Sequence, residues 1–356
     1  MKIATVIGAR PQFIKAAMLS RLFKKEPDIQ EIIIHTGQHF DAAMSKVFFD
    51  ELDIPKPDYN LDVAGLTHGA MTGRMLERIE KVLFEEKPDL VLVYGDTNST
   101  LAGALAASKL HIPVAHVEAG LRSFNRQMPE EINRVLTDHV SDLLFAPTKA
   151  EVKSLLAEGI HDKKIHLVGD VTQDAAIFYA DRAVKPDVAP DKPFVLATVH
   201  RAENTDDPAR LDEIFKALSE ISRKLSVVLP IHPRTRQKIA EADIKVPSNS
   251  ALHLVNPVGY LEMIWLLKHC KLVMTDSGGL QKEAYFFKKP CIILRDGTEW
   301  VELVKAGVNV LAGTSTQTIL SAFEQIIVNQ LKFTPGLYGS GKASEKIMRY
   351  IKGYIA

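Results

Sequence analysis

The feature of this sequence that most limits its fold is a regular alternation of short apolar runs with longer stretches of helical periodicity. The short runs are rich in Val and Ile. This pattern predicts strands alternating with helices, and therefore parallel sheets covered by helices on both faces. The predicted strands form a first series at residues 2–8, 31–37, 90–95, 114–119, 143–148 and 164–169, and a second at residues 194–200, 226–232, 252–255, 271–276, 290–295 and 308–313.

The restart of the series predicts two domains. The chain of 356 residues is longer than a single core usually allows. We therefore expect an α/β protein of two Rossmann-like, doubly wound domains with a cleft between them. Residues 180–193 contain three prolines and cannot be regular throughout. The predicted domains are residues 1–168 and 169–342, with a terminal helix at 343–356 packing back on the N-terminal domain.

Charge and composition argue against several functional classes. Lys plus Arg and Asp plus Glu are both 44, so no overall basic field exists to gather nucleic acid. No apolar run approaches the roughly 20 residues of a membrane helix, and the first residues lack a signal-peptide pattern, so we expect a cytoplasmic protein. Cys270 and Cys291 lie in apolar runs without metal-ligand spacing, which predicts reduced core thiols and no metal site.

Ligands of parallel sheets bind at the carboxyl ends of the strands, which selects a few segments. The first strand is followed by Arg10, Pro11 and Lys15. Proline suits the first turn of a helix, and the free N–H groups there attract anions, so Arg10 and Lys15 predict a phosphate or carboxylate site. The alternative is a turn with two solvated cations.

Three carboxylates also follow strands or open a helix in the N-terminal half: Asp96, Glu118 and Glu131. Each has a structural alternative, as a helix cap, as an ion pair of Glu118 with Arg122, and as a first-turn acid beside Arg134. Together they predict general acid and base chemistry, because crowding and burial separate carboxylate pKa values. A magnesium site is disfavoured because no acidic loop of regular spacing accompanies them.

The C-terminal half suggests a diphosphate. His200 and Arg201 follow one strand, and His232 follows the next. Gly278 and Gly279 lie between a strand and a helix, where backbone N–H groups can approach phosphate. The segment is neither GxGxxG nor GxxxxGK[ST], which argues against a redox dinucleotide and a P-loop.

In combination these segments resemble the non-hydrolysing UDP-N-acetylglucosamine 2-epimerases over essentially the whole chain. The matching motifs, in chain order, are GARPQFIK, GQHF, YGDTNST, HVEAGLRS, PEEINR, HRAEN, DSGGLQKE and YGSGKAS. The resemblance implies a GT-B-like architecture, a UDP-sugar substrate, a homodimer and no cofactor.

The resemblance also implies a mechanism. Loss of the C2 proton with anti elimination of UDP gives a 2-acetamidoglucal, and UDP adds back as C2 is protonated on the opposite face. Asp96, Glu118 and Glu131 resemble the acid and base groups, and His200 resembles the group that assists departure of UDP. The implied substrate and UDP contacts are Arg10, Lys15, Arg201, His232, Ser277, Gly278, Gly279 and Glu283. An activating UDP-sugar site in some members corresponds to Gln38, His39 and Arg74.

Departures from the common family pattern favour one branch. Gln12, Asp41 and the segment 123–128 resemble enzymes acting on UDP-2,3-diacetamido-2,3-dideoxyglucuronate, a precursor of bacterial surface polysaccharide such as lipopolysaccharide O antigen. A neutral Gln12 and an added Arg126 near the sugar would suit a uronate carboxylate. These departures also put the activating site in question.

Four alternatives to this function stay open. One is epimerisation of UDP-N-acetylglucosamine to UDP-N-acetylmannosamine. A GT-B glycosyltransferase and a hydrolysing 2-epimerase are enzymatic alternatives, since a fold does not fix a function. A catalytically silent UDP-sugar binding protein is the alternative from another class, and it would be expected to lack part of the carboxylate trio.

Overall fold

The computed structural model describes residues 1–38, 54–245, 251–329 and 331–355 and divides into two compact units. Unit 1 comprises Met1–Ala175 and Gly336–Ala356, and unit 2 comprises Ala176–Pro335. The first changeover lies inside helix α7 (Val171–Ala180) rather than at residue 169, because this helix continues through it. The chain returns at Gly336, ahead of residue 343, and Tyr338 there is buried and accepts a hydrogen bond from the backbone N–H of Asp170.

Unit 1 contains a seven-stranded parallel sheet in the order β3-β2-β1-β4-β5-β6-β7. The inner strands are continuous apolar runs, as expected for a sheet covered on both faces. The strands are β1 (Lys2–Ile7), β2 (Gln30–His35), β3 (Tyr59–Asn60), β4 (Leu90–Tyr94), β5 (Val114–Val117), β6 (Leu143–Ala146) and β7 (Ile165–Leu167). Of these, the sequence pattern missed only the two-residue edge strand β3.

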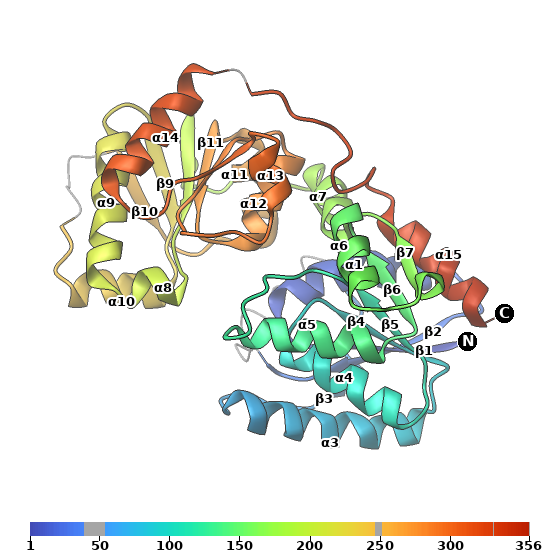
Figure 1. The fold of residues 1–356 in the computed structure, drawn as a ribbon. Coiled ribbons are helices and arrows are strands. Elements are labelled where there is room, and N and C mark those ends of the chain that lie inside the picture. The colour runs from blue at the N-terminus through green and yellow to red at the C-terminus, as the bar shows by residue number, and fades with distance from the viewer. Residues whose placement is uncertain (39–53, 246–250, 330, 356) are drawn as a thin grey trace. The chain divides into compact units, whose positions relative to one another are not determined.

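Helices cover both faces of this sheet. In Figure 1, α3, α4 and α5 lie on one face and α1 and α15 on the other. Helix α15 returns from the far end of the chain: Tyr350 packs near Phe145 of β6, and Lys352 pairs with Glu26 just after α1. The helices are α1 (Arg10–Phe23), α3 (His68–Glu86), α4 (Asn98–Lys109), α5 (Pro129–Val140), α6 (Lys149–Ala157) and α15 (Ala343–Ile355), with a 3-10 turn at Asp162–Lys164.

Unit 2 repeats the arrangement with a six-stranded parallel sheet in the order β10-β9-β8-β11-β12-β13. Helices α9 and α14 lie on one face and α11 and α12 on the other (Figure 1). Its strands are β8 (Phe194–Thr198), β9 (Ser226–Pro230), β10 (Leu252–Val255), β11 (Leu272–Thr275), β12 (Cys291–Ile293) and β13 (Asn309–Leu311). Its helices are α8 (Ala202–Thr205), α9 (Pro208–Ser222), α10 (Pro233–Glu241), α11 (Tyr260–His269), α12 (Gly278–Phe286), α13 (Val301–Lys305) and α14 (Thr316–Val328).

Both sheets reverse their strand order once, and this reversal positions the candidate sites. In unit 1 the chain leaves β1 toward β2 and leaves β4 toward β5, in opposite directions along the sheet. In unit 2 the equivalent strands are β8 and β11. The carboxyl ends of such a strand pair leave an open crevice where ligands bind. The two doubly wound units confirm the predicted fold class.

Two further sequence expectations concern the interior and the membrane. Cys270 and Cys291 are buried free thiols, as expected, and burial raises the pKa of Cys270 to about 12. Among the described helices, no helix is both long enough and apolar enough to cross a bilayer.

The carboxyl group of Glu31, at the start of β2, is largely removed from water. The Glu31 carboxylate accepts hydrogen bonds from the hydroxyls of Thr5 (2.6 Å) and Ser20 (3.0 Å) beneath α1. Burial raises the pKa of Glu31 from 4.5 to about 7, although both hydroxyls oppose the rise. Because the folded protein holds this proton more tightly than the unfolded chain, stability is lost as pH rises from about 4.5 to about 7.

We expect Glu31→Gln to raise the free energy of unfolding at pH 8 by about 2 kcal/mol, because an amide keeps both hydroxyl contacts without a buried charge. At pH 4 the gain should vanish, since Glu31 is then protonated in both states. Urea unfolding at pH 4, 6 and 8 measures the difference. Glu85→Gln, at an exposed position of α3, is the control. A gain that does not change with pH would contradict this account.

Candidate functional site

The turn between β1 and α1 packs tightly against the side chains of Thr36 and Ser99. A Cβ on Gly8 would lie 2.0 Å from Thr36 Oγ1 and 2.3 Å from Ser99 Oγ, so only glycine fits. The buried Gln12 side chain accepts the N–H groups of Gly8 (2.8 Å) and Ala9 (2.9 Å) through Oε1. Its Nε2 donates to the carbonyl oxygen of Tyr94 (2.9 Å) and to Thr100 Oγ1 (3.0 Å).

These four bonds use all the hydrogen-bonding groups of the Gln12 amide. Gln12 therefore fastens the β1–α1 turn to the end of β4. That a neutral residue at this position suits a uronate stays a prediction, and the structure adds that the Gln12 side chain is committed inside the protein. Arg10, the first residue of α1, lies half-buried at the same turn.

Lys15 and Glu118 form a largely buried ion pair between α1 and the end of β5. Glu118 has φ +74°, a left-handed conformation that is strained for a residue with a side chain. Gly95, at the end of β4, borders this pair: a Cβ there would lie 3.4 Å from Glu118 Oε2 and 3.6 Å from Lys15 Nζ. The sequence suggested Arg122 as the partner of Glu118, whereas the structure gives Lys15.

Arg134 links the other two predicted carboxylates. It is buried on α5, and its Nε and Nη2 approach Asp96 Oδ2 at 2.9 and 2.6 Å. Its Nη1 lies 3.0 Å from Glu131 Oε2. Since Asp96 directly follows Gly95, which borders Glu118, the three carboxylates gather at one edge of the sheet. Sequence reasoning treated Arg134 as a surface partner and missed this bridging position.

The Glu131 carboxylate also holds the loop that precedes α5 in the chain. Oε2 accepts the backbone N–H (2.8 Å) and hydroxyl (2.9 Å) of Ser123, and Oε1 accepts the backbone N–H of Phe124 (3.0 Å). Burial would raise the pKa of Glu131, but these bonds and Arg134 outweigh it and hold the pKa below its usual value. Glu131 is thus an ionised anchor for the loop that carries Arg126.

Gln38 and Arg74, two residues of the predicted activating site, make separate contacts. Gln38 Oε1 accepts the N–H (3.0 Å) and hydroxyl (2.7 Å) of Ser99, which opens α4 together with Asn98. Arg74 is exposed on α3 and pairs with Glu77 at 3.8 Å. His39 and Asp41 lie outside the described residues.

In unit 2 a buried carboxylate arranges the turn after β8. Asp276, which follows β11, accepts the backbone N–H groups of His200 (3.0 Å) and Arg201 (2.9 Å) and the side-chain amide of Asn204 (3.2 Å). The His200 ring approaches the same carboxylate, with Nδ1 3.5 Å from Oδ1. Asp276 therefore joins the two strands at the switch point, a role that sequence reasoning did not assign.

The two glycines that open α12 differ in their surroundings. A Cβ on Gly278 would lie 3.5 Å from Trp300 Nε1 and 3.8 Å from Arg201 Nη2. No heavy atom of the described residues lies within 4 Å of a Cβ on Gly279, and its φ is not in the left-handed range. Neither packing against the described residues nor backbone conformation therefore requires glycine at 279.

The remaining predicted residues of unit 2 lie near these turns. Ser277 immediately precedes α12, and Glu283 on α12 accepts a hydrogen bond from the Tyr260 hydroxyl (3.3 Å). His232 caps α10: its Nδ1 accepts the backbone N–H of Arg234 at 3.2 Å. The structure thus places His232 at the end of β9, one strand away from the switch point.

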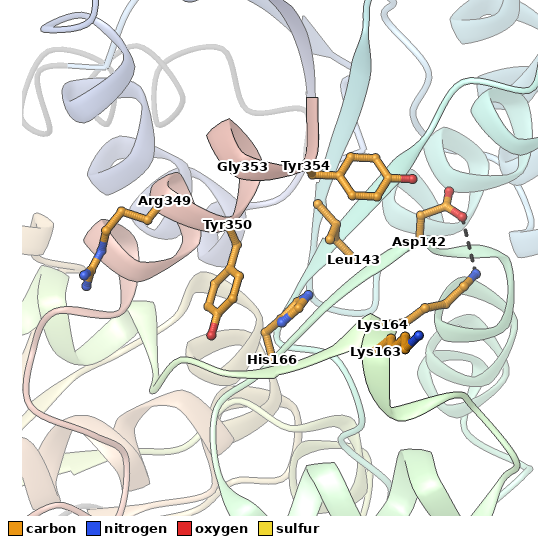
Figure 2. A pocket seen from close by; sticks show the side chains of 9 residues that line it. All are labelled: Asp142, Leu143, Lys163, Lys164, His166, Arg349, Tyr350, Gly353 and Tyr354. Atoms are coloured by element: carbon orange, nitrogen blue, oxygen red, sulfur yellow. Dashed lines mark hydrogen bonds and ion pairs between the residues drawn. The ribbon is translucent and has the colours of Figure 1, made fainter. Parts of the chain in front are cut away.

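A cavity of about 450 Å³ lies elsewhere in unit 1 (Figure 2). It opens near the amino ends of β6 and β7, whereas the carboxylates lie at carboxyl ends. Lys164 pairs with Asp142 there, and His166 stacks on Tyr350. No predicted site residue lines it. Within the described ranges, no group of three His, Cys, Asp or Glu side chains is placed to hold a metal ion.

Comparison with known proteins gives the family of the chain. A family model described as UDP-N-acetylglucosamine 2-epimerase matches residues 21–352. The chain is 58% identical over 355 residues to the UDP-2,3-diacetamido-2,3-dideoxy-D-glucuronate 2-epimerase of Pseudomonas aeruginosa, with 99% of both chains covered. It is 35% identical over 380 residues to the UDP-N-acetylglucosamine 2-epimerase of Escherichia coli, covering 99% of this chain and 98% of that one.

Solved structures give the same result. The Methanocaldococcus jannaschii UDP-GlcNAc 2-epimerase, in complex with UDP-GlcNAc and UDP, superposes with a TM-score of 0.91 at 45% identity, covering 99% of this chain and all of that chain. The Neisseria meningitidis enzyme bound to UDP-GlcNAc gives 0.90 at 33% identity, with 99% and 100% covered. The sequence motifs, the two doubly wound units and these matches agree that the chain belongs to the UDP-N-acetylglucosamine 2-epimerase family.

Proposed function

We propose that this epimerase inverts C2 of a UDP-linked 2-acetamido sugar by eliminating and re-adding UDP. The observation that carries the proposal is the cluster of Asp96, Glu118 and Glu131 at the switch point of unit 1. Lys15 pairs with Glu118, and Arg134 pairs with both Asp96 and Glu131. Inversion requires proton transfer on both faces of the ring, and thus more than one acid or base. An intact trio also favours an enzyme over a silent binding protein.

The proposed reaction has two steps, an elimination and a re-addition. A carboxylate takes the C2 proton, the C2–H electrons form a C1–C2 double bond, and the bond from C1 to the UDP oxygen breaks. UDP then adds back to C1 of the acetamidoglucal while a second carboxyl group protonates C2 from the opposite face. We assign proton transfer to Asp96 and Glu118, with Glu131 completing the set by holding Arg134 and the loop at Ser123.

UDP binding is assigned mainly to unit 2. Free N–H groups at the start of α12, from Gly278 and Gly279, suit a diphosphate, and Arg201 beside Gly278 adds charge. We assign to His200 the role of assisting departure of UDP, and to Glu283 that of accepting ribose hydroxyls. Further assigned contacts are Ser277 and His232 from unit 2 and Arg10 and Lys15 from unit 1.

The favoured substrate is UDP-2,3-diacetamido-2,3-dideoxyglucuronate, converted to its manno epimer for surface polysaccharide. Support comes from the 58% identity to the P. aeruginosa protein of that name. The exposed Arg126, on the loop that Glu131 anchors, is a candidate cation for the uronate carboxylate. Epimerisation of UDP-N-acetylglucosamine is the alternative, because relatives 35% to 46% identical carry that name.

The family resemblance also supports a cytoplasmic homodimer and an activating UDP-sugar site that includes Gln38, His39 and Arg74. The net charge of zero is consistent with a protein that does not bind nucleic acid.

Incubation with the UDP-sugar in deuterium oxide is expected to give deuterium at C2 of both epimers, detected by NMR. Asp96→Asn and Glu118→Gln should lower kcat by at least about 100-fold, the usual value of a general acid or base. Glu131→Gln should lower kcat too, because both Glu131 oxygens accept backbone N–H groups and the NH2 of an amide would face one of these donors. Retention of protium at C2 by the wild-type enzyme would exclude the elimination mechanism.

Substrate choice is tested by assaying both UDP-sugars side by side. We expect kcat/KM to be higher for the diacetamido uronate, and Arg126→Ala to lower it by about tenfold, the value of a charge-assisted hydrogen bond. Any activity on UDP-N-acetylglucosamine should change little, since that sugar has no carboxylate. Arg223→Ala, at an exposed position of unit 2, is the control. Equal losses of kcat/KM on both sugars would show that Arg126 does not bind the uronate carboxylate.

Gly279→Ala is expected to fold normally and to weaken UDP binding by about tenfold or more, because the added methyl occupies the space assigned to phosphate. Calorimetric titration with UDP measures the affinity, and thermal unfolding measures the fold. Gly353→Ala, at another helical glycine with open surroundings, should leave UDP affinity unchanged. Unchanged affinity in Gly279→Ala would move the phosphate site away from the start of α12.

A further inference from the structure

A buried row of alternating charges lies beneath the candidate site in unit 1. Asp138 on α5 contacts His116 on β5, with Nδ1 2.7 Å from Oδ1. Its other oxygen lies 2.7 Å from Arg122 Nη1. Arg122 in turn forms a two-pronged pair with Glu158 at 2.6 and 2.7 Å. His116 and Asp138 are almost completely inaccessible to solvent. None of these four residues belongs to the predicted catalytic set.

The two ring nitrogens of His116 have different partners. Nε2 lies 2.7 Å from the carbonyl oxygen of Gly95, which has no proton, so Nε2 donates. Nδ1 faces Asp138. Burial would raise the pKa of Asp138, but the contacts with His116 and Arg122 outweigh it and hold the pKa below its usual value. Asp138 is therefore a carboxylate, held by His116, Arg122 and the backbone N–H of Gly120.

This pair fixes the backbone on both sides of Glu118. His116 is held through its ring, and Gly120 is held because its N–H donates to Asp138 Oδ2 at 3.0 Å. One carboxylate thus anchors the residues two before and two after Glu118. The left-handed conformation of Glu118 is strained and persists only where the surroundings enforce it.

The same pair also reaches the neighbouring strand. Through Nε2, His116 holds the carbonyl of Gly95, which directly precedes Asp96. His116 therefore connects the strand end that bears Glu118 to the strand end that bears Asp96. Helix α5 supplies the anchor: Glu131, Arg134 and Asp138 are spaced three and four residues apart, so they lie on one helix face.

We propose that Asp138 and His116 are a positioning pair that sets Glu118 and Asp96 relative to each other for proton transfer. The proposal rests on the proposed function of these two carboxylates. The pair touches no substrate and acts through the backbone at Gly95 and Gly120. Misplacement of a reacting group by about 1 Å lowers rates by about 100-fold, so loss of the pair should reduce kcat far more than binding.

Three variants separate the contacts of the pair. His116→Asn keeps a donor toward Asp138 but does not reach the Gly95 carbonyl, whereas His116→Gln keeps a donor toward Gly95 but loses Asp138. Asp138→Asn replaces the carboxylate that contacts His116 and Gly120 with a neutral amide. Asp174→Asn is the matched control, because Asp174 is also a buried carboxylate of unit 1 but caps α15 through Ala343 and Ser344.

We expect His116→Asn and Asp138→Asn to lower kcat for C2 deuterium exchange by about 10- to 100-fold. KM and UDP affinity should stay within about threefold. Asp174→Asn should lower the unfolding temperature without lowering kcat. If the two variants behave as Asp174→Asn does, or if KM changes while kcat does not, the positioning role is overturned.

One test uses the wild-type enzyme alone, so it requires neither turnover nor a correctly folded variant. Nitrogen-15 NMR of the histidines should show that Nε2 of His116 carries a proton and that this proton is hydrogen-bonded to the Gly95 carbonyl. An Nε2 without that proton or that hydrogen bond overturns the proposal. Absence of C2 exchange in the wild-type enzyme, with the Nε2 hydrogen bond present, would instead refute the proposed function, so the two failures are distinguishable.

Discussion

The guanidinium of Arg134 is the interaction on which the candidate site of unit 1 most depends. It lies buried between Asp96 and Glu131 and neutralises carboxylates that would otherwise repel each other. Removing one partner of a buried ion pair costs about 3–5 kcal/mol, because the remaining charge is left without compensation. Arg134 is thus both a structural requirement of α5 and the reason that two acids from distant parts of the chain share one edge of the sheet.

Both units solve the same geometric problem with a buried carboxylate. Where the strand order reverses, two strand ends must be held together while the space above them stays open. Asp276 joins the ends of β8 and β11 by accepting N–H groups from His200 and Arg201. In unit 1, Asp138 acts through His116 to join β5 to Gly95 at the end of β4. A carboxylate suits this task because it accepts several hydrogen bonds at once.

Particular residues show how far the sequence could predict this site. The position of Glu118 at a buried strand end correctly indicated that it needs a partner, but the partner is Lys15, about a hundred residues away, and not the nearby Arg122. Gln12 was noted as a neutral departure from a family motif, and the sequence did not show that its amide ties β1 to β4. Arg134 was treated as a surface residue because helical spacing shows which residues share a face but not whether that face is buried.

The sequence by itself determined the series of strands, the two α/β units, the family and the positions of the carboxylates and glycines that follow the strands. These depend on local periodicity and on motifs, which are properties of neighbouring residues. Only the tertiary structure decided which cation pairs with which acid, that Glu131 holds the loop at Ser123, and that His116 bridges Asp138 and the Gly95 carbonyl. Such pairings join residues far apart in the chain, and they follow from the strand order and from the helix face that packs against the sheet.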